Sequence, residues 1–137
     1  MRIHDDTVRQ FMHQPPVEVH SHWTLRGVAR TLAKGPVGAV VVRGERPTAA
    51  PGARGEGVVS ERDIVRALAD DMDLDATRVE DLMTTDLVCA EPDESVLVVA
   101  TRMLDNGIRH LPVVEDGVVI GMVSERDLLR ALVDRGP

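Results

Sequence analysis

Two nine-residue segments of the chain carry the side chains best suited to hold a small molecule. Residues 60–68 read Ser-Glu-Arg-Asp-Ile-Val-Arg-Ala-Leu, and residues 124–132 repeat this sequence with seven of the nine positions identical. Their carboxylates, Asp63 and Asp127, can each accept two hydrogen bonds from a cis-diol. The chemistry of these two related segments is therefore compatible with a ligand that carries such a diol.

The first residues of each segment suit an anionic group. Ser60 and Ser124 fall where a helix is expected to begin, among backbone N–H groups that favour an anion. Arg62 and Arg126 follow two positions later and can add charge-assisted hydrogen bonds to a phosphate. These positions are consistent with a phosphorylated ligand.

The spacing Ser-x-x-Asp also has a purely structural interpretation. It is close to a capping box, in which two side chains satisfy each other's backbone N–H groups and keep the helix from fraying. Asp here takes the place of the usual Glu or Gln. Spacing alone leaves capping and ligand binding equally open, and the two roles are compatible.

The two segments belong to an internal repeat that runs through most of the chain. Residues 57–59 align with residues 121–123 at a spacing of 64, and further upstream Val41-Val42 aligns with Val113-Val114 at a spacing of 72. The drop from 72 to 64 predicts eight extra residues in the first repeat. We place them in an enlarged, mobile hairpin loop over residues 43–56, which is rich in Gly, Pro and Ala.

Each repeat has the same expected order of elements, β-α-β-β-α, which predicts an α/β fold. Two small sheets are expected to pack about a pseudo-twofold axis, because one repeat alone buries too little surface to fold well. We expect repeats at residues 8–69 and 79–135, joined by a solvated linker over 70–78. The second repeat is expected to contain a lead-in helix at 79–83, strands at 87–90, 110–114 and 118–123, a helix that begins within 92–95 and ends at 106–107, a turn at 115–117 and a last helix capped by Ser124.

Composition limits the range of functions. The net charge of −7 argues against binding to nucleic acid or to an anionic membrane. One Phe, one Trp and no Tyr leave few rings for stacking on nucleobases. The single cysteine, Cys89, cannot form an internal disulfide and has no visible base partner, and the first residues do not read as a signal peptide. We therefore expect a cytoplasmic protein that is not an enzyme.

Two possible metal sites are set aside. Residues 71–75 begin like a calcium loop, but Ala76 stands where glycine is needed and Leu82 where the bidentate carboxylate belongs. His20 and His22 have no Cys or Glu partner at ligand spacing. The sequence predicts no metal.

The second repeat resembles the CBS domain family. The resemblance rests on Asp-Leu-Met-Thr at 81–84, Pro-Asp-Glu-Ser at 92–95, Arg-His-Leu-Pro-Val-Val at 109–114 and Gly-Met-Val-Ser-Glu-Arg-Asp-Leu at 121–128. Both repeats together cover the chain from about residue 8 to residue 133.

The first repeat departs from this pattern at two places. Ser21 stands where the second repeat has Pro92, and Gly-Ala-Val at 38–40 stands where it has His-Leu-Pro at 110–112. The resemblance is therefore weaker there.

The resemblance implies a Bateman module, a pair of CBS repeats with two ligand clefts. Such clefts bind adenosine-containing ligands such as AMP, ADP, ATP or S-adenosylmethionine, and no other cofactor is required. In the family the acidic residue of each last helix holds the ribose hydroxyls, which maps onto Asp63 and Asp127. The serine three places earlier, Ser60 or Ser124, faces a phosphate. The resemblance also implies a homodimer and a separate effector protein.

The resemblance further implies that each cleft is completed by residues of the other repeat. Arg109 and His110 could reach a phosphate, whereas the small residues at 37–39 offer fewer donors. We therefore expect the clefts to differ in affinity. Val17, Val37, Gly38 and Ala39 are expected to complete the cleft of Asp127, and Val88, Ile108, Arg109 and His110 the cleft of Asp63.

The weaker first repeat keeps a second function open. The clefts could be vestigial, and the chain could then serve only as a scaffold that dimerises.

Overall fold

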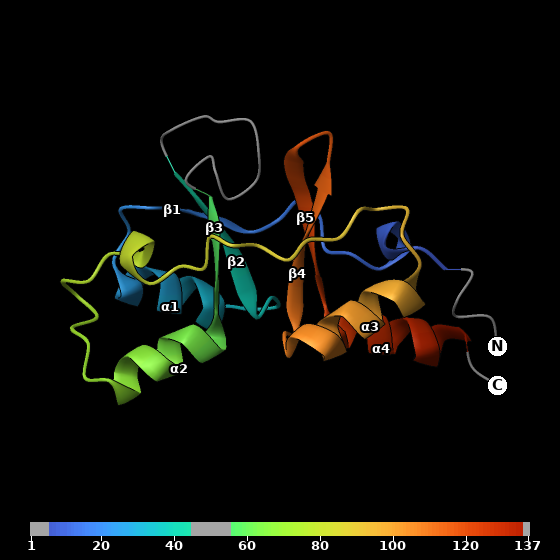
Figure 1. The fold of residues 1–137 in the computed structure, drawn as a ribbon. Coiled ribbons are helices and arrows are strands. Elements are labelled where there is room, and N and C mark those ends of the chain that lie inside the picture. The colour runs from blue at the N-terminus through green and yellow to red at the C-terminus, as the bar shows by residue number, and fades with distance from the viewer. Residues whose placement is uncertain (1–5, 45–55, 136–137) are drawn as a thin grey trace. The chain divides into compact units, whose positions relative to one another are not determined.

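The chain folds into two compact units, seen here in a computed structural model that describes residues 6–44 and 56–135. The first-repeat unit is the continuous segment Val17–Leu87. The second-repeat unit combines Val88–Pro137 with the N-terminal segment Met1–Pro16. Each unit is a small α/β assembly with its own hydrophobic core (Figure 1).

The first-repeat unit has the predicted β-α-β-β-α order. Its sheet has the strand order β1-β2-β3, in which β1 runs parallel and β3 antiparallel to the central strand. The central strand is buried along most of its length, because both of its edges are paired and the helices cover the sheet. The elements are β1 (Glu18–His20), α1 (Leu25–Ala33), β2 (Ala39–Arg43), β3 (Gly57–Ser60) and α2 (Glu61–Ala69).

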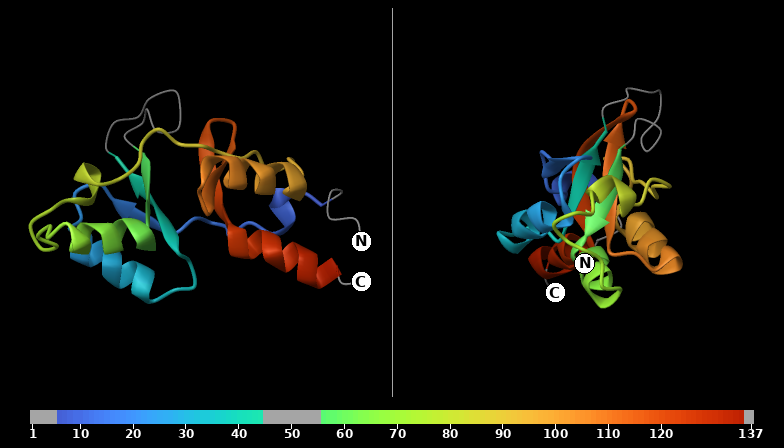
Figure 2. Two further views of the ribbon diagram at one scale, coloured as in Figure 1. Left: turned by 60° about the horizontal axis from the view of Figure 1, so that its bottom comes forward. Right: turned by 90° about the vertical axis from the view of Figure 1, so that its left-hand side faces the viewer.

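Helix α1 shows how local sequence places an element. Thr24 caps it by accepting a hydrogen bond from the backbone N–H of Gly27 at 3.2 Å. Leu25, Val28 and Leu32 recur at helical spacing and are buried against the sheet. Helix α2 lies beside α1 in the same unit (Figure 2).

The second-repeat unit has the same order except at its first strand. The predicted strand at 87–90 is reduced to a single parallel bridge between Ala90 and Val113. In the first repeat the backbone N–H of Ser21 donates to Arg43 and prolongs the pairing at 3.0 Å. Pro92 occupies the equivalent position and has no N–H to donate, so the pairing stops. The named elements are α3 (Val96–Asn106), β4 (His110–Glu115), β5 (Val118–Ser124) and α4 (Glu125–Arg135).

Two turns of this unit confirm predictions from the sequence. Gly107 ends α3 in the left-handed conformation, with φ of 62°. Asp116 and Gly117 connect β4 to β5 with φ values of 53° and 77°, and two consecutive positive values are the signature of the hairpin turn that matches strand twist.

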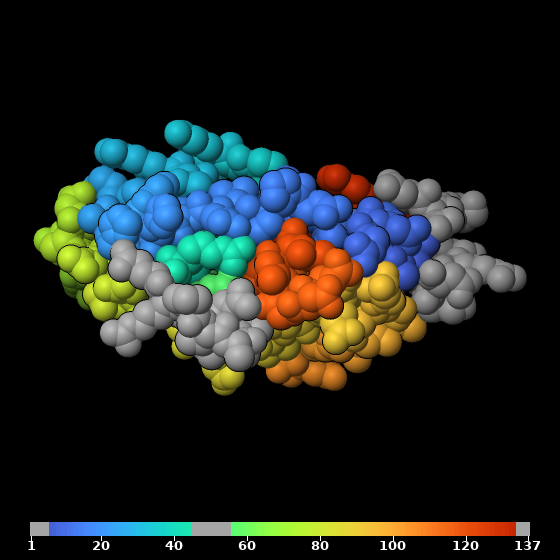
Figure 3. All heavy atoms as spheres, turned by 90° about the horizontal axis from the view of Figure 1, so that it is seen from above, coloured from blue at the N-terminus to red at the C-terminus, as the bar shows by residue number. Residues whose placement is uncertain are grey.

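The lead-in segments exchange between the repeats, which the sequence did not predict. The short 3-10 helix η2 (Val8–Gln10) precedes the first repeat, yet Val8 and Met12 lie in the core of the second-repeat unit. His13 and Met122 exchange backbone hydrogen bonds at 2.8 and 2.9 Å. The N-terminal segment (dark blue) thus lies against β5 of the second repeat (Figure 3).

The matching segment of the second repeat packs on the first. The 3-10 helix η3 (Val79–Asp81) confirms the predicted lead-in helix and buries Val79 in the core of the first-repeat unit. Thr84 and Val58 exchange two backbone hydrogen bonds, each 3.0 Å long. Each repeat is therefore completed by the lead-in of the other, so each compact unit combines the body of one repeat with the lead-in of the other.

The expected solvated linker at 70–78 is an ordered part of the first-repeat unit. Thr77 and Leu74 carbonyls accept hydrogen bonds from the backbone N–H groups of Leu25 and Arg26, each at 3.0 Å. These N–H groups start helix α1 and have no partner within the helix, so the linker satisfies them. The Arg26 guanidinium also pairs with Asp75, which lowers the pKa of that carboxyl.

Strand pairing corrects the alignment of the two repeats by one residue. Ala39 pairs with Ser60, and His110 pairs with Ser124. Ala39 and His110 are therefore equivalent at a spacing of 71, so the spacing of 72 was wrong for these strands and the insertion has seven residues rather than eight. The central part of the predicted loop, residues 45–55, lies outside the described residues.

Candidate functional site

The first half-site is the start of helix α2, where Ser60 and Asp63 hold each other. The Ser60 backbone N–H donates to Asp63 Oδ2 at 2.8 Å, and the Ser60 hydroxyl donates to the same oxygen at 3.0 Å. In return Ser60 Oγ accepts from the Asp63 backbone N–H at 3.3 Å. The next backbone N–H, of Glu61, donates to the carbonyl of Gly38 at 2.9 Å. This bond places the start of β2 beside the helix start.

The second half-site repeats this arrangement at the start of helix α4. The Ser124 backbone N–H donates to Asp127 Oδ2 at 2.8 Å, and Ser124 Oγ accepts from the Asp127 backbone N–H at 3.1 Å. The Glu125 backbone N–H donates to the carbonyl of Arg109 at 2.8 Å. Gly38 and Arg109 therefore occupy equivalent positions in the two half-sites.

Both half-sites are capping boxes, so the structural interpretation of the motif is confirmed. Each cap uses only one carboxylate oxygen, Oδ2 of Asp63 or of Asp127. Within the described part of the chain, no residue donates a hydrogen bond to Oδ1 of either aspartate. Both aspartates are half-buried. One acceptor oxygen therefore stays available at each helix start, as a diol-binding role requires.

The remaining predicted residues of each repeat belong to the unit of that repeat. In the first-repeat unit, Val17 accepts a backbone hydrogen bond from Val41 at 2.9 Å, and Val37 and Ala39 flank Gly38. Arg62 occupies the second position of α2 with an exposed side chain, as Arg126 does in α4.

The second-repeat unit contains the other set of predicted residues. Val88 and Ile108 are half-buried against its core, and His110 is half-buried at the first position of β4. Arg109 is exposed beside them. The expectation that each set completes the half-site of the other repeat stays a prediction.

The two half-sites differ in the positive charge beside the helix start. Arg109 and His110 stand where the first-repeat unit has Gly38 and Ala39. Arginine is a planar, permanently charged donor of bidentate hydrogen bonds to phosphate, whereas glycine contributes only its backbone. The second-repeat unit therefore brings more positive charge to its strand end.

The sequence did not predict a half-buried ion pair that positions the Val88–Cys89 segment. Arg102 donates to both carboxylate oxygens of Glu94, at 2.8 and 2.6 Å, and to the carbonyl of Cys89 at 2.9 Å. This pairing lowers the pKa of Glu94 and raises that of Arg102. Burial raises the pKa of the Cys89 thiol, which opposes formation of a nucleophilic thiolate. The spacing of eight residues between Glu94 and Arg102 is the only signal in the sequence.

Metal-binding clusters and membrane-spanning helices are both absent from the residues that the structure describes. No group of three or more His, Cys, Asp or Glu side chains there is arranged to hold a metal ion. No helix in residues 6–44 or 56–135 combines the length and the apolar character needed to cross a membrane.

Comparison with known proteins identifies the repeat. The sequence model of the CBS domain matches residues 8–70 and 79–134. The uncharacterized protein MJ1225 of Methanocaldococcus jannaschii is 30% identical over 129 residues, which are 93% of this chain and 43% of that protein. The chain spans about half the length of the curated relatives that it matches.

Two solved structures are similar over almost their whole length. The CBS domain pair of protein MJ0100, in complex with 5′-methylthioadenosine and S-adenosyl-L-methionine, is 26% identical with a TM-score of 0.80, and the match covers 95% of this chain and 98% of that chain. The CBS domain protein PAE2072 of Pyrobaculum aerophilum, complexed with AMP, is 32% identical with a TM-score of 0.79, and the match covers 94% and 97%. The predicted tandem-repeat fold is thereby confirmed.

Proposed function

Because the chain belongs to the CBS domain family, we propose that it is a regulatory module that binds an adenine-containing nucleotide at Asp63 and Asp127. One observation carries this proposal. Each aspartate keeps one carboxylate oxygen, Oδ1, that the capping box does not use. A ribose supplies the pair of hydroxyl donors that such an oxygen accepts.

The surrounding groups suit the rest of a nucleotide. Ser60 and Ser124 place a hydroxyl at a helix start, where backbone N–H groups and the helix dipole favour a phosphate. Arg62 and Arg126, which directly precede the aspartates in the sequence, add exposed guanidinium groups. Aliphatic side chains and backbone groups hold the adenine, because the chain has one Phe, one Trp and no Tyr.

The ligands of related proteins support the chemical class. One similar structure contains AMP, and another contains 5′-methylthioadenosine and S-adenosylmethionine. All three carry the adenosine core, so the shared adenosine is what we assign to this chain, as AMP, ADP, ATP or S-adenosylmethionine. The arginines at the helix starts favour the phosphorylated members of this group.

The output of the module is binding rather than turnover. Nucleotide binding shifts the population of packing arrangements, and a separate effector protein, acting on the homodimer, responds to that shift. Cytoplasmic residence is part of the proposal, because a single cysteine gives no sign of an oxidising compartment.

The direct test is calorimetric titration of protein from which bound ligand has been removed. AMP, ADP, ATP, NADH and S-adenosylmethionine are titrated in turn. The proposal expects saturable binding of at least one of them, with no chemical change of the recovered nucleotide. Absence of binding by all five, or turnover of any one, would overturn it.

The completed capping boxes favour one alternative, a dimerising scaffold with vestigial half-sites. In that case Ser60, Asp63, Ser124 and Asp127 serve only to start their helices. Asp63→Asn and Asp127→Asn separate the two functions, since an asparagine oxygen can still accept the capping bond. Equal binding by the wild type and the double variant would leave the motif as a helix cap alone, and absence of binding by either protein would favour the scaffold.

A further inference from the structure

The segment Val88–Ala90 stands where the second-repeat unit would have its first strand, but it lacks most of the backbone pairing of a strand. In the first-repeat unit the Val17 carbonyl accepts a hydrogen bond from the backbone N–H of Val41 at 2.9 Å. Val88 and Pro112 are the equivalent residues at the spacing of 71. Because proline has no N–H, the Val88 carbonyl cannot receive the bond that holds Val17.

Only one residue of this segment remains in the strand ladder. The backbone N–H of Ala90 donates to the carbonyl of Pro112 at 2.9 Å, and the Ala90 carbonyl accepts from the N–H of Val114 at 2.8 Å. In the part of the chain that the structure describes, no backbone hydrogen bond holds Val88. The sheet therefore fixes the end of the segment and leaves its start without a bond.

Arg102 supplies a contact at this start from helix α3. Its guanidinium donates to the carbonyl of Cys89, the residue directly after Val88, at 2.9 Å. The same group forms two hydrogen bonds with Glu94, whose carboxylate also accepts from the backbone N–H of Glu91 at 2.8 Å. The side chains of Arg102 and Glu94 are 28% and 25% exposed, so solvent screens their attraction less than at the open surface. One guanidinium thus holds the segment and the turn that follows it against α3.

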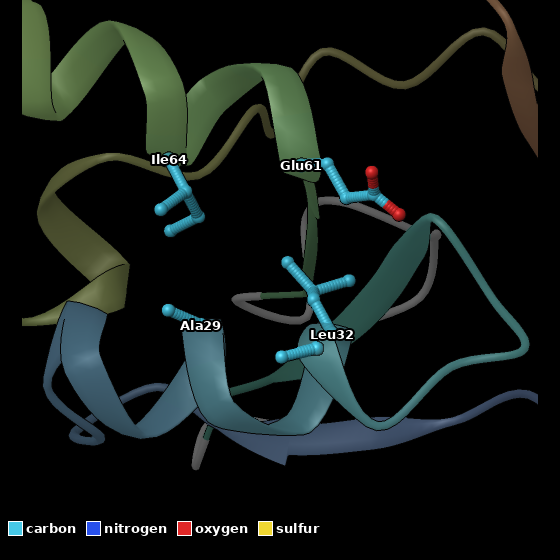
Figure 4. A pocket seen from close by; sticks show the side chains of 5 residues that line it. Ala29, Leu32, Glu61 and Ile64 are labelled. Carbon is cyan, nitrogen blue, oxygen red and sulfur yellow. The ribbon is translucent and has the colours of Figure 1, made fainter.

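Helix α1, the counterpart of α3, makes no such contact with its strand. Thr31 stands at the position of Arg102, and its hydroxyl donates to the carbonyl of Gly27 in the same helix at 3.2 Å. Within residues 6–44 and 56–135, no side chain of α1 forms a hydrogen bond with β1. The face of α1 toward α2 offers no side-chain donor either, because its residues there are apolar and border a hollow of about 350 Å³ lined by Ala29, Leu32, Ala33, Glu61 and Ile64 (Figure 4).

We propose that Arg102 is a positioning residue for nucleotide binding, which holds Val88 in place by bonding the carbonyl of Cys89. This inference rests on the proposed function, in which Val88 contacts the nucleotide, and adds a residue that acts through that contact. A segment that is already fixed loses less conformational entropy when a ligand binds to it. The strand ladder fixes Val17 in the first-repeat unit, and the guanidinium has the same effect on Val88.

Two matched variants separate this role from a contribution to stability alone. Arg102→Met removes the bond to the Cys89 carbonyl together with the ion pair, and keeps an aliphatic stem in its place. Glu94→Gln removes the charge of the pair but leaves Arg102 able to bond both the glutamine oxygen and the Cys89 carbonyl. Calorimetric titration with AMP is expected to show about fivefold weaker binding at one half-site for Arg102→Met, and a change below about twofold for Glu94→Gln. Equal weakening by both variants would overturn the inference, since Arg102 would then act only through the ion pair.

A second substitution tests whether the guanidinium stands in for the missing strand bond. Pro112→Val places here the residue type of Val41 and restores a backbone N–H that can reach the Val88 carbonyl. The double variant Arg102→Met/Pro112→Val is expected to bind AMP within about twofold of the wild type, and Pro112→Val alone is expected to bind it equally well. A double variant that binds AMP as weakly as Arg102→Met would contradict the inference.

Cys89 provides a measurement that needs no nucleotide. It is the single cysteine of the chain, it is half-buried, and burial raises the pKa of its thiol. Release of the segment exposes this thiol to solvent. In ligand-free protein, Arg102→Met is therefore expected to speed the reaction with an aromatic disulfide reagent about tenfold, and Glu94→Gln less than about threefold.

Failure of this inference and failure of the proposed function give different results. A wild type that binds none of the titrated nucleotides would overturn the proposed function, and the binding role of Arg102 with it, whatever the thiol rates are. A wild type that binds AMP no better than Arg102→Met, with the same thiol rate in both proteins, would overturn the positioning role and leave the proposed function intact.

Discussion

The two half-sites share a helix start and differ in the strand beside it. In both, a serine and an aspartate form the same reciprocal cap, and the next backbone N–H bonds to a carbonyl of the neighbouring strand. That carbonyl belongs to Gly38 in the first-repeat unit and to Arg109 in the second. Backbone geometry therefore holds Asp63 and Asp127 in the same way in both units, while one side chain sets how much positive charge lies nearby.

This comparison separates what the repeat must keep from what it can change. The cap and the backbone bond can form with any residue at the strand position, because the strand contributes only its carbonyl. The first repeat has Gly38 at this position and the second has Arg109. The hydrogen bonds are the same in both, and only the positive charge beside the helix start differs. Two half-sites with a common frame can therefore hold the same adenosine core with different affinities for its phosphates.

The substitutions with the largest expected effect on stability concern a feature that both units share. In each unit a lead-in segment packs closely against a glycine. A Cβ atom added at Gly57 would lie 2.9 Å from the Thr84 carbonyl oxygen, and one added at Gly121 would lie 2.8 Å from that of His13. Gly57→Ala and Gly121→Ala are each expected to lower the free energy of unfolding by about 2 kcal/mol, measured by urea denaturation.

The helical Gly27 provides the control for this prediction. A Cβ atom there meets only ordinary contacts at 3.6 and 3.7 Å. Gly27→Ala is expected to stabilise the protein by about 0.5–1 kcal/mol, because glycine inside a helix costs backbone entropy. If Gly57→Ala and Gly121→Ala each lower the free energy of unfolding by less than about 0.5 kcal/mol, the packing of each lead-in against the other repeat is contradicted.

The next effect sharpens the contrast between Gly38 and Arg109. Arg109→Ala is expected to weaken AMP binding about fivefold to tenfold, measured by calorimetry, because a charge-assisted hydrogen bond to phosphate is lost. Binding of adenosine, which has no phosphate, is expected to change little. Arg130→Ala, an exposed charge further along α4, is the control.

A double-mutant cycle shows which half-site Arg109 serves. The resemblance to the family implies that Arg109 acts on the ligand held by Asp63 in the other repeat. Arg109→Ala is then expected to couple with Asp63→Asn and to be additive with Asp127→Asn. The reverse pattern would assign Arg109 to the half-site of its own unit.

The smallest expected effect concerns the ion pair that only the second-repeat unit has. Glu94 has a lowered pKa because Arg102 bonds its ionised form, so the pair stabilises the protein above the ordinary pKa of 4.5 and loses this effect as the pH falls through the lowered value. Glu94→Gln is expected to cost about 0.5–1 kcal/mol at pH 7 and nothing at low pH, measured by urea denaturation at several pH values.

The more exposed ion pair between Glu80 and Arg78 provides the control for this prediction. Glu80 and Arg78 are more exposed and lie 3.5 Å apart, so Glu80→Gln is expected to have almost no effect at any pH. If Glu94→Gln lowers the free energy of unfolding by the same amount at pH 3 and at pH 7, the side chain contributes through packing and not through its charge.

The local features of the fold could be predicted from the sequence because they depend on neighbouring residues. The Ser-x-x-Asp caps, the glycine that ends α3 and the hairpin turn at Asp116-Gly117 each follow from a few adjacent side chains. The order of elements followed from their repetition. For this reason both half-sites could be predicted at the starts of their helices.

The features that escaped prediction depend on residues far apart in the chain. Val8 and Val79 are apolar residues of short lead-in helices, and nothing in their own segments shows that they enter the core of the other repeat. The run Val40-Val41-Val42 can be aligned in either register, since a one-residue slip leaves the same residue types in place. The equivalence of Gly38 with Arg109 therefore needed the strand pairing.

The measurement that tests the central claim most directly is AMP titration of the double variant Asp63→Asn/Asp127→Asn beside the wild type. Asparagine keeps the cap but loses the charge that accepts both ribose hydroxyls, so the thermal midpoint is expected to stay unchanged. AMP affinity is expected to fall at least about thirtyfold, as for loss of hydrogen bonds to a charged group. Equal AMP affinity in the two proteins would contradict the account and leave the Ser-x-x-Asp motif as a helix cap alone.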